Sequence, residues 1–292
     1  MSRQPLRLAL LEAERILAEA GVASPRVDAE LLAAHVVGVE RGRLMMVPLV
    51  DPSVVEAYRR LVVRRAAREP LQHLTGTAVL GPATVAVGPG VFTPRPETEL
   101  LLEWGLAELA GVPAPLVVDL CTGTGALAIA VAASRPDAVV HAVEADPVAL
   151  SWAARNVEAH VAGGGASVTL HAADVRWPDL LPELESHVDL VLCNPPYVPD
   201  GTPVPPEVAG WDPPGAVFGG PDGLEIVRAV IAASAGLLCH GGALAIEHDE
   251  THGELVPELL RRRRVLTDVE AHRDLAGRPR FATARRAAPA PS

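Results

Sequence analysis

The sequence contains no lysine, so its 25 basic residues are all arginines, and 36 acidic residues outnumber them. The net charge of −11 argues against a protein that binds mainly to nucleic-acid phosphates, because such binding depends on many Lys and Arg side chains. The charge is uneven: residues 1–72 carry 11 arginines and 9 acidic residues, whereas residues 73–292 carry 14 and 27. The two parts are therefore expected to contact different partners.

Cysteines are few, and long apolar runs are missing. Cys121, Cys193 and Cys239 are far apart and form no C-x-x-C pair, which argues against a disulfide framework and a zinc site. No apolar run approaches the ~18 residues that a membrane span needs. The first 12 residues lack the apolar core and the cleavage site of a signal peptide. We expect a cytoplasmic protein that does not associate with membranes.

The spacing of apolar residues changes along the chain and predicts its organisation. Helical spacing without a strand pattern predicts an N-terminal helical bundle over residues 1–72. Short β-like pieces predict a hairpin-like connector over residues 73–92. Alternating strands and helices over residues 93–286 predict an α/β domain with an open, mostly parallel sheet. Residues 287–292 are expected to form a disordered tail.

Within the α/β part, five strands are expected at residues 116–120, 139–143, 168–171, 188–193 and 243–247, and two more near 265–270 and 281–284. Residues 199–223 are rich in Pro and Gly and too long for an ordinary connection. Long loops of this kind are usually functional, so this segment is a candidate rim of an active site.

A glycine-rich turn follows the first expected strand and opens a helix. It consists of Cys121, Thr122, Gly123, Thr124 and Gly125. Glycines permit a tight turn and let a ligand approach the backbone, so a nucleotide-like ligand is expected. Glu144 ends the second strand, 19 residues after Gly125, where its carboxylate can accept hydrogen bonds from both hydroxyls of a ribose.

Two further residues extend this ligand site. Asp174 follows the third strand and is placed to bind the exocyclic amine of an adenine, and Val175 is placed beside the edge of the ring. The turn also fits the G-x-G-x-x-A dinucleotide pattern. At this point a dehydrogenase and a transferase therefore both remain open.

The motif Asn194-Pro195-Pro196-Tyr197 follows the strand at 188–193, at the sheet edge where open α/β sheets bind ligands. The prolines restrict the backbone, so the Asn194 side-chain oxygen and the Pro195 carbonyl form a rigid pair of acceptors. Two such oxygens can hold both hydrogens of a planar NH₂ group, with the ring of Tyr197 beside it. The motif predicts a site for an amino group conjugated to a carbonyl or a ring.

The glycine turn together with N-P-P-Y resembles the class I S-adenosylmethionine-dependent methyltransferases that act on planar NH₂ nitrogen. Further motifs occur in the order seen in the HemK/PrmC family of release-factor glutamine N5-methyltransferases. They are R-E-P-L-Q-H-L-T-G at 68–76, F-T-P-R-P-E-T-E at 92–99, G-G-P-D-G-L at 219–224 and E-H at 247–248. The resemblance covers nearly the whole chain.

The resemblance implies a Rossmann-like α/β fold with a mostly parallel seven-stranded sheet, preceded by a helical bundle that recognises the substrate. It implies methyl transfer from S-adenosyl-L-methionine to the amide N5 of the glutamine in the GGQ loop of peptide chain release factors. The product is S-adenosyl-L-homocysteine, and no metal is involved. The expected partner is the release factor, bound by a monomer without direct contact to nucleic acid or membrane.

The same resemblance assigns the site residues. Asn194, Pro195, Pro196 and Tyr197 are expected to bind the substrate and to be catalytic. Cofactor contacts are expected from Cys121 to Gly125 and from Glu144, Asp174, Val175 and Asn194. Pro94, Glu97 and Thr98 are expected to cover the methionine end of the cofactor.

Four places depart from the family pattern, and one of them is Leu80-Gly81, near which the family often has an aromatic residue. Cys121 stands where the family usually has glycine, and it can serve there if its backbone avoids positive φ. Glu144 replaces the usual aspartate and preserves the ribose chemistry. Val175 stands where an aromatic residue is common.

Alternative functions remain open from the sequence. N-P-P-Y serves the ring NH₂ groups of adenine or guanine equally well, although the acidic second part of the chain weighs against a nucleic-acid substrate. Methylation of a ribosomal-protein glutamine uses the same catalytic residues. A binding module without catalysis is disfavoured, because no motif residue is missing.

Overall fold

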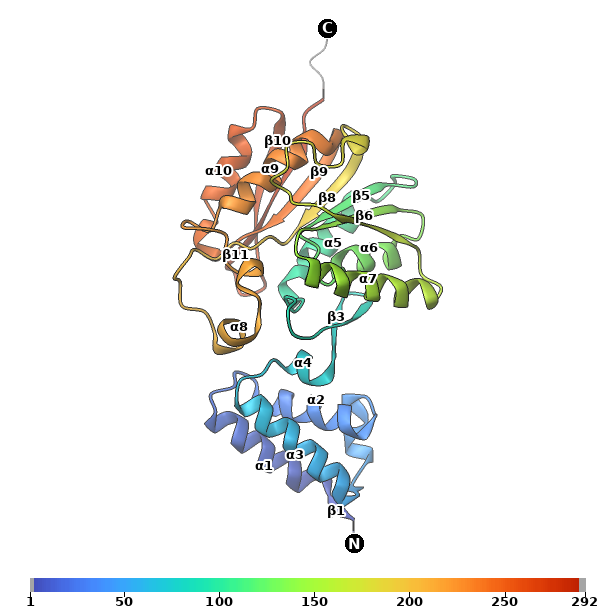
Figure 1. Cartoon of the computed structure of the whole chain (residues 1–292), viewed down its shortest axis with the longest axis vertical. Coiled ribbons are helices and arrows are strands. Elements are labelled where there is room, and N and C mark those ends of the chain that lie inside the picture. The colour runs from blue at the N-terminus through green and yellow to red at the C-terminus, as the bar shows by residue number, and fades with distance from the viewer. Residues whose placement is uncertain (1–2, 289–292) are drawn as a thin grey trace. The chain divides into compact units, whose positions relative to one another are not determined.

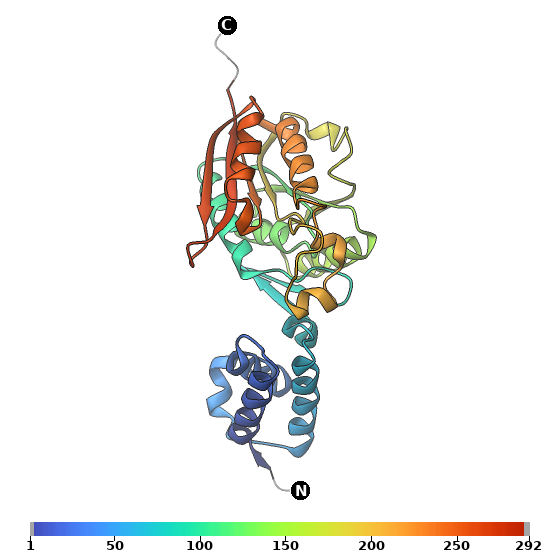
Figure 2. The same cartoon turned by 90° about the vertical axis from the view of Figure 1, so that its left-hand side faces the viewer.

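The computed structural model describes residues 3–288. The chain forms two compact units, one comprising Met1–Thr77 and Val204–Trp211, the other Ala78–Pro203 and Asp212–Ser292. Figures 1 and 2 show the helical character of the smaller unit and the central sheet of the larger one. Within residues 3–288, no helix combines the length and the apolar character that crossing a membrane requires.

The smaller unit confirms the predicted helical bundle. Its main helices are α1 (Leu6–Glu19), α2 (Pro25–Val37) and α3 (Pro52–Ala66). They pack their apolar faces together, and the buried hydroxyl of Tyr58 donates a 3.0 Å hydrogen bond to the Ala29 carbonyl. Pro52 begins α3, where its missing N–H leaves no hydrogen bond unmade. A 3₁₀ helix, η1 (Arg41–Met46), and the short α4 (Leu71–Thr75) complete the unit's N-terminal segment.

The expectation that no strand interrupts residues 1–72 was wrong. Two short strands, β1 (Gln4–Pro5) and β2 (Leu49–Val50), pair in an antiparallel arrangement. Each strand has only two residues, which is too short to give an alternating pattern of apolar and polar side chains.

The helix α8 (Pro206–Trp211), which comes from the middle of the long Pro- and Gly-rich segment, belongs to the smaller unit. Glu207 accepts hydrogen bonds from Arg65 at 2.8 Å and Arg68 at 2.7 Å, and Arg65 also binds Asp28 at 2.8 Å. Burial by itself raises the pKa of Glu207, but the bonds from Arg68 and Arg65 lower it to about 2. The centre of segment 199–223 is thus ion-paired to α3, and a place of this segment at the rim of an active site stays a prediction.

The larger unit contains the predicted seven-stranded sheet, with the strand order β10-β11-β9-β8-β5-β6-β7. The parallel strands of its centre and one edge are β5 (Leu116–Leu120), β6 (Val139–Glu144), β7 (Val168–Ala172), β8 (Val188–Cys193) and β9 (Leu238–Glu247). At the other edge, β11 (Pro279–Arg286) runs antiparallel to both β9 and β10 (Leu266–Arg273). The last three strands are longer than the sequence predicted.

Helices cover both faces of this sheet (Figure 1). One face packs against α5 (Glu99–Glu108), α6 (Ala126–Ser134) and α7 (Pro147–Ala162), and the other against α9 (Glu225–Leu237) and α10 (Leu255–Arg262). Side chains of a strand alternate between the faces: in β8, Leu190 and Leu192 belong to the first core, and Val191 and Cys193 to the second. Because both faces are buried, these strands are rich in apolar residues on both faces, with single polar residues such as Asp119 in β5 and Asp189 in β8.

The predicted connector contains a two-stranded sheet of β3 (Thr77–Leu80) and β4 (Ala83–Ala86). Asn156 of α7 accepts from the Ala86 N–H at 2.8 Å and donates to its carbonyl at 3.0 Å, so β4 is bound to the α/β core. In the expected tail, the Ala287 N–H donates to the Val265 carbonyl at 2.9 Å. Residues 289–292 of that tail lie outside the described residues.

Candidate active site

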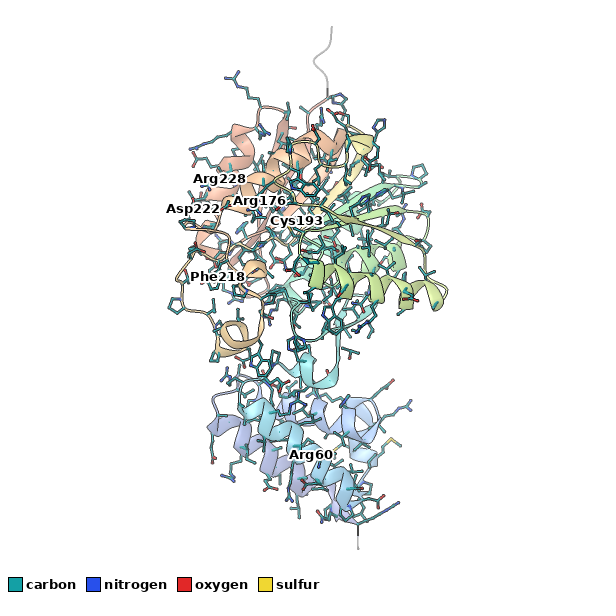
Figure 3. The ribbon with its side chains drawn as sticks, viewed as in Figure 1. Arg60, Arg176, Cys193, Phe218, Asp222 and Arg228 are labelled. Atoms are coloured by element: carbon teal, nitrogen blue, oxygen red, sulfur yellow. The ribbon has the colours of Figure 1, made fainter. Side chains whose placement is uncertain are left out.

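Four neighbouring parallel strands end at one level of the sheet, which brings distant parts of the sequence together. The register pairs at this level are Val143 with Leu120, Leu120 with Cys193, and Cys193 with Ile246. Figure 3 labels Cys193 at this position of β8. The residues that come next in the four strands are Glu144, Cys121, Asn194 and Glu247. The carboxyl ends of β6, β5, β8 and β9 therefore form the candidate site.

A buried carboxyl group holds the glycine turn in place. Asp119 of β5 is 2% exposed and accepts hydrogen bonds from the Thr122 hydroxyl at 2.5 Å and from the Ala128 N–H at 3.2 Å. Burial raises the pKa of Asp119 to about 7, although both bonds oppose the rise. Asp119 thus ties the turn to the first residues of α6.

Glu144 lies directly beside this turn. Its Oε2 accepts from the Gly123 N–H at 2.8 Å and its Oε1 from the Asp146 N–H at 2.9 Å, while burial raises its pKa. Each carboxylate oxygen keeps a free lone pair, so the group can still accept two hydroxyl hydrogens. Gly123 has φ of 58°, and a Cβ added there would meet no atom within 4 Å. Open space beside a two-oxygen acceptor fits the ribose of a nucleoside cofactor.

Cys121 can serve in place of glycine if its backbone avoids positive φ, and this condition is not met. Its φ is 59°, in the left-handed region that favours glycine. A side chain in this region crowds its own backbone, which costs roughly 1–2 kcal/mol per residue. The glycine turn of this chain is thus strained at its first residue.

We expect the substitution Cys121→Gly to stabilise the protein. It relieves the left-handed strain but adds the roughly 0.5–1 kcal/mol entropic cost of glycine, for a net gain of about 0.5–1 kcal/mol in the free energy of unfolding. Urea unfolding measures the change. Cys121→Ala is the control, because it removes the thiol and keeps the strain. Equal stability of the Gly and Ala variants would contradict the explanation.

Asp174 and Val175 follow β7 beside Glu144, since the Ala173 N–H donates to the Glu144 carbonyl at 3.1 Å. Both oxygens of Asp174 accept from Arg176, whose hydrogen bonds hold the pKa of Asp174 below its usual range. The side chain of Val175 packs in the core on the α9 and α10 face. Contacts of these two residues with adenine stay a prediction.

Asn194, Thr98, Tyr197 and Glu247 form one hydrogen-bonded group. The Asn194 Nδ2 donates to Thr98 Oγ1 at 3.0 Å, and the Thr98 hydroxyl donates to Glu247 Oε2 at 3.0 Å. The Tyr197 hydroxyl donates to Glu247 Oε1 at 2.9 Å. Thr98 ends the 3₁₀ helix η2 (Pro96–Thr98), so the P-R-P-E-T-E and N-P-P-Y motifs meet here. Pro94 and Glu97 of the same segment are partly exposed.

The backbone of the N-P-P-Y motif is supported by the G-G-P-D-G segment. The Gly219 N–H donates to the Val198 carbonyl at 2.9 Å. A Cβ on Gly219 would lie 2.5 Å from the Pro196 carbonyl oxygen, and one on Gly223 would lie 2.3 Å from that of Tyr197. Only glycine fits at these two positions, which explains why the G-G-P-D-G segment begins and ends with glycine. Nearby, Asp222 forms an ion pair with Arg228 at 2.5 Å (Figure 3).

The sequence interpretation assigned no role to Glu247 and gave Thr98 only a place beside the cofactor. Glu247 is 1% exposed, and burial raises its pKa to about 7 against the lowering effect of the bonds from Tyr197 and Thr98. A signal was present: Glu247 is the last residue of the strand expected at 243–247, just as Glu144 is the last residue of β6. A buried ionisable residue with a shifted pKa at the ligand-binding edge of a parallel sheet is a candidate for a functional role.

The strand order, with one antiparallel strand next to the edge, and the glycine turn after β5 define the class I S-adenosylmethionine-dependent methyltransferase fold. A solved structure of a T. thermophilus 16S rRNA N2 G1207 methyltransferase shares this fold, with a TM-score of 0.52 and 22% identity. The match covers 72% of this chain and 49% of that one, so this chain spans about half the length of that protein.

The chain belongs to the release factor glutamine methyltransferase family, as its motifs predicted. The family described as PrmC N-terminal domain matches residues 9–76, and the methyltransferase small domain matches residues 84–205. The release factor glutamine methyltransferase of Mycolicibacterium smegmatis is 54% identical over 97% of this chain and 98% of its own length. Those of Mycobacterium tuberculosis and Deinococcus radiodurans are 48% and 39% identical, over 96% and 97% of this chain and 91% and 99% of their own lengths.

Proposed function

We propose that this protein transfers the methyl group of S-adenosylmethionine to the side-chain amide N5 of the glutamine in the GGQ loop of peptide chain release factors. The observation that carries the proposal is the orientation of Asn194. Its Nδ2 is bound to Thr98, which leaves Oδ1 as the end that can accept an N–H of the substrate. The names of relatives that match nearly the full chain supply the substrate.

When bound, the cofactor supplies an electrophilic methyl group on a sulfonium sulfur. Glu144 and the backbone of the glycine turn would hold its ribose and methionine portions. Asp174, Val175, Pro94, Glu97 and Thr98 are proposed as its further neighbours. Asn194 also contributes, because it follows the strand next to the turn.

The side-chain amide of glutamine is a poor nucleophile because its lone pair is delocalised. Asn194 Oδ1 and the Pro195 carbonyl would accept both N–H bonds, turn the lone pair toward the methyl carbon and favour the positive charge that builds on nitrogen. The nitrogen would take the methyl group that the cofactor supplies, leaving the sulfur as the thioether of S-adenosyl-L-homocysteine, and would then lose a proton to water. Pro196 keeps the two acceptors rigid, and Tyr197 flanks the amide.

Positioning is expected to supply most of the rate enhancement. In-line orientation can lower a barrier by roughly 7–11 kcal/mol, whereas a general base contributes about 10²- to 10⁴-fold. Glu247, the buried carboxylate joined to Asn194 through Thr98, binds the hydroxyls of Thr98 and Tyr197 through its two oxygens. This arrangement suits orientation of the amide better than removal of its proton.

The helical unit is proposed to contact the release factor, with the protein acting as a monomer in the cytoplasm and without nucleic acid. This part rests on the match of residues 9–76 to the PrmC N-terminal domain and on the more basic composition of residues 1–72.

The test is transfer of tritiated methyl groups into purified release factor. We expect labelling of the wild-type factor and none of a factor whose GGQ glutamine is replaced by alanine. Label that persists in the altered factor would reject the target residue. Labelling of a ribosomal protein, or of DNA or RNA with salt-dependent binding, in place of the factor would favour the corresponding rival substrate.

A further inference from the structure

The hydroxyl of Thr98 joins a buried carboxyl group to the side chain of Asn194. A hydroxyl group has one hydrogen to donate and can accept through its oxygen. Thr98 donates its hydrogen to Glu247 Oε2, so only its oxygen is left for Asn194. Asn194 must then present Nδ2 to Thr98, as it does at 3.0 Å. The direction of one hydrogen bond thus fixes the direction of the next.

This direction depends on the charge of Glu247. An ionised carboxylate only accepts, so it forces both Thr98 and Tyr197 to donate. A protonated Glu247 carries a hydrogen of its own and can donate it to Thr98. The Thr98 hydrogen is then free to point at Asn194, where it stabilises the flipped amide with Oδ1 turned inward. Only the ionised form therefore selects one orientation of Asn194.

Polar, charged and titratable groups face Glu247 from η2, from β8 and the residues after it, and from β11. They are Thr98 and Glu97 in η2, Cys193 in β8, Tyr197 after β8 and Arg280 in β11. His248 follows Glu247 in the chain, and burial lowers its pKa. Arg280 lowers the pKa of Glu247 and Glu97 raises it, while burial is the largest influence and brings it to about 7. Ionisation of Glu247 thus falls within the range in which an enzyme assay can be run.

We propose that Glu247 and Thr98 are positioning residues that turn Asn194 Oδ1 toward the substrate and so make the site select a glutamine amide over a glutamate carboxylate. An outward oxygen attracts an N–H donor and repels a carboxylate, whereas an outward Nδ2 does the reverse. The inference rests on the proposed methyl transfer, because that reaction is what places a glutamine amide of the substrate beside Asn194. Thr98 and Tyr197 are the two donors that the carboxylate orients.

Thr98→Val is the first test, because valine keeps the shape of threonine and removes the hydroxyl. We expect kcat to fall about tenfold, since the amide of Asn194 loses its preferred orientation but not its place. The KM for the release factor and the Kd for S-adenosylmethionine should change less than about threefold. Thr98→Ser keeps the hydroxyl and should recover kcat to within about threefold of the wild type. Unchanged kcat in a folded Thr98→Val protein would overturn the proposal.

The second test is the pH profile of kcat, which a purely structural role of Glu247 would leave unchanged. Wild-type kcat should rise with pH through the pKa of Glu247, because deprotonation creates the orienting carboxylate. Glu247→Gln should abolish this rise and lower kcat about tenfold, because the neutral amide no longer forces Thr98 to donate. A rise that persists in Glu247→Gln would overturn the proposal, whether or not the Thr98→Val protein folds.

A third readout separates this inference from the proposed function. The ¹⁵N-labelled side-chain NH₂ of Asn194, assigned by its absence in Asn194→Asp, can be followed by NMR without any substrate. Its signals should shift as pH passes the pKa of Glu247 in the wild type and should be insensitive to pH in Glu247→Gln. Insensitive signals in the wild type would overturn the relay. A wild type that shows the expected shift but never labels release factor would overturn only the proposed substrate.

Discussion

Replacing Asn194 with alanine is expected to lower kcat about 10²- to 10³-fold and to leave the affinity for S-adenosylmethionine within a few-fold of the wild type. The variant removes one of the two acceptors proposed to hold the glutamine amide. Loss of a single preorganised hydrogen-bonding group at a reacting centre typically costs this much. The Pro195 carbonyl and the glycine turn remain, so binding of the cofactor should survive. Steady-state methyl transfer and calorimetric titration of the cofactor measure the two effects.

Asn194→Asp is the matched variant, because it keeps the size of the side chain and an oxygen acceptor. Aspartate has no N–H to donate to Thr98, whose own hydrogen is used by Glu247. A carboxylate oxygen at position 194 and the Thr98 oxygen would then face each other as two acceptors in a partly buried site. The kcat of this variant should therefore fall as well. A kcat within tenfold of the wild type in the folded Ala variant would rule out the proposed role of Asn194.

The sequence predicted the centre of the α/β unit well because β6 and β8 are short, largely apolar runs with a chemically distinctive residue at or just after the end. Glu144 at the end of β6 and Asn194 after β8 were found in this way, and the parallel register places both at the same edge of the sheet. Capping residues in the sequence also mark the ends of α2, since Pro25 begins it and Gly38 ends it in the left-handed conformation.

What the sequence could not predict depends on contacts between distant residues. The pairing of Glu207 with Arg65 and Arg68 spans about 140 positions, and no local pattern indicates that α8 joins the helical unit. The left-handed backbone of Cys121 is imposed by the turn and overrides the preference of the residue. The relay from Glu247 to Asn194 required knowing the direction of two hydrogen bonds, which a sequence does not encode.

Replacing Glu144 with alanine is expected to have the largest effect on the cofactor. The carboxylate is proposed to accept both ribose hydroxyls while it holds the N–H groups of Gly123 and Asp146. Hydrogen bonds to a charged group contribute about 1.5–3 kcal/mol each, so losing the two ribose bonds should raise the Kd for S-adenosylmethionine about 10²- to 10⁴-fold. Calorimetric titration measures this change.

Two variants make that result specific. Glu144→Asp keeps the charge and is the residue usual in the family, so its Kd should stay within about tenfold of the wild type. Asp137→Ala removes a carboxylate that is distant from the four strand ends and binds Arg135 at 2.8 Å, and it should not change the Kd.

Because burial raises the pKa of Glu144, affinity in the wild type should weaken as pH falls through that raised pKa, since a protonated carboxyl loses an acceptor. A Kd within threefold of the wild type for Glu144→Ala would mean that the ribose is bound elsewhere. The proposal that the cofactor binds at the carboxyl ends of β5 and β6 would then be wrong.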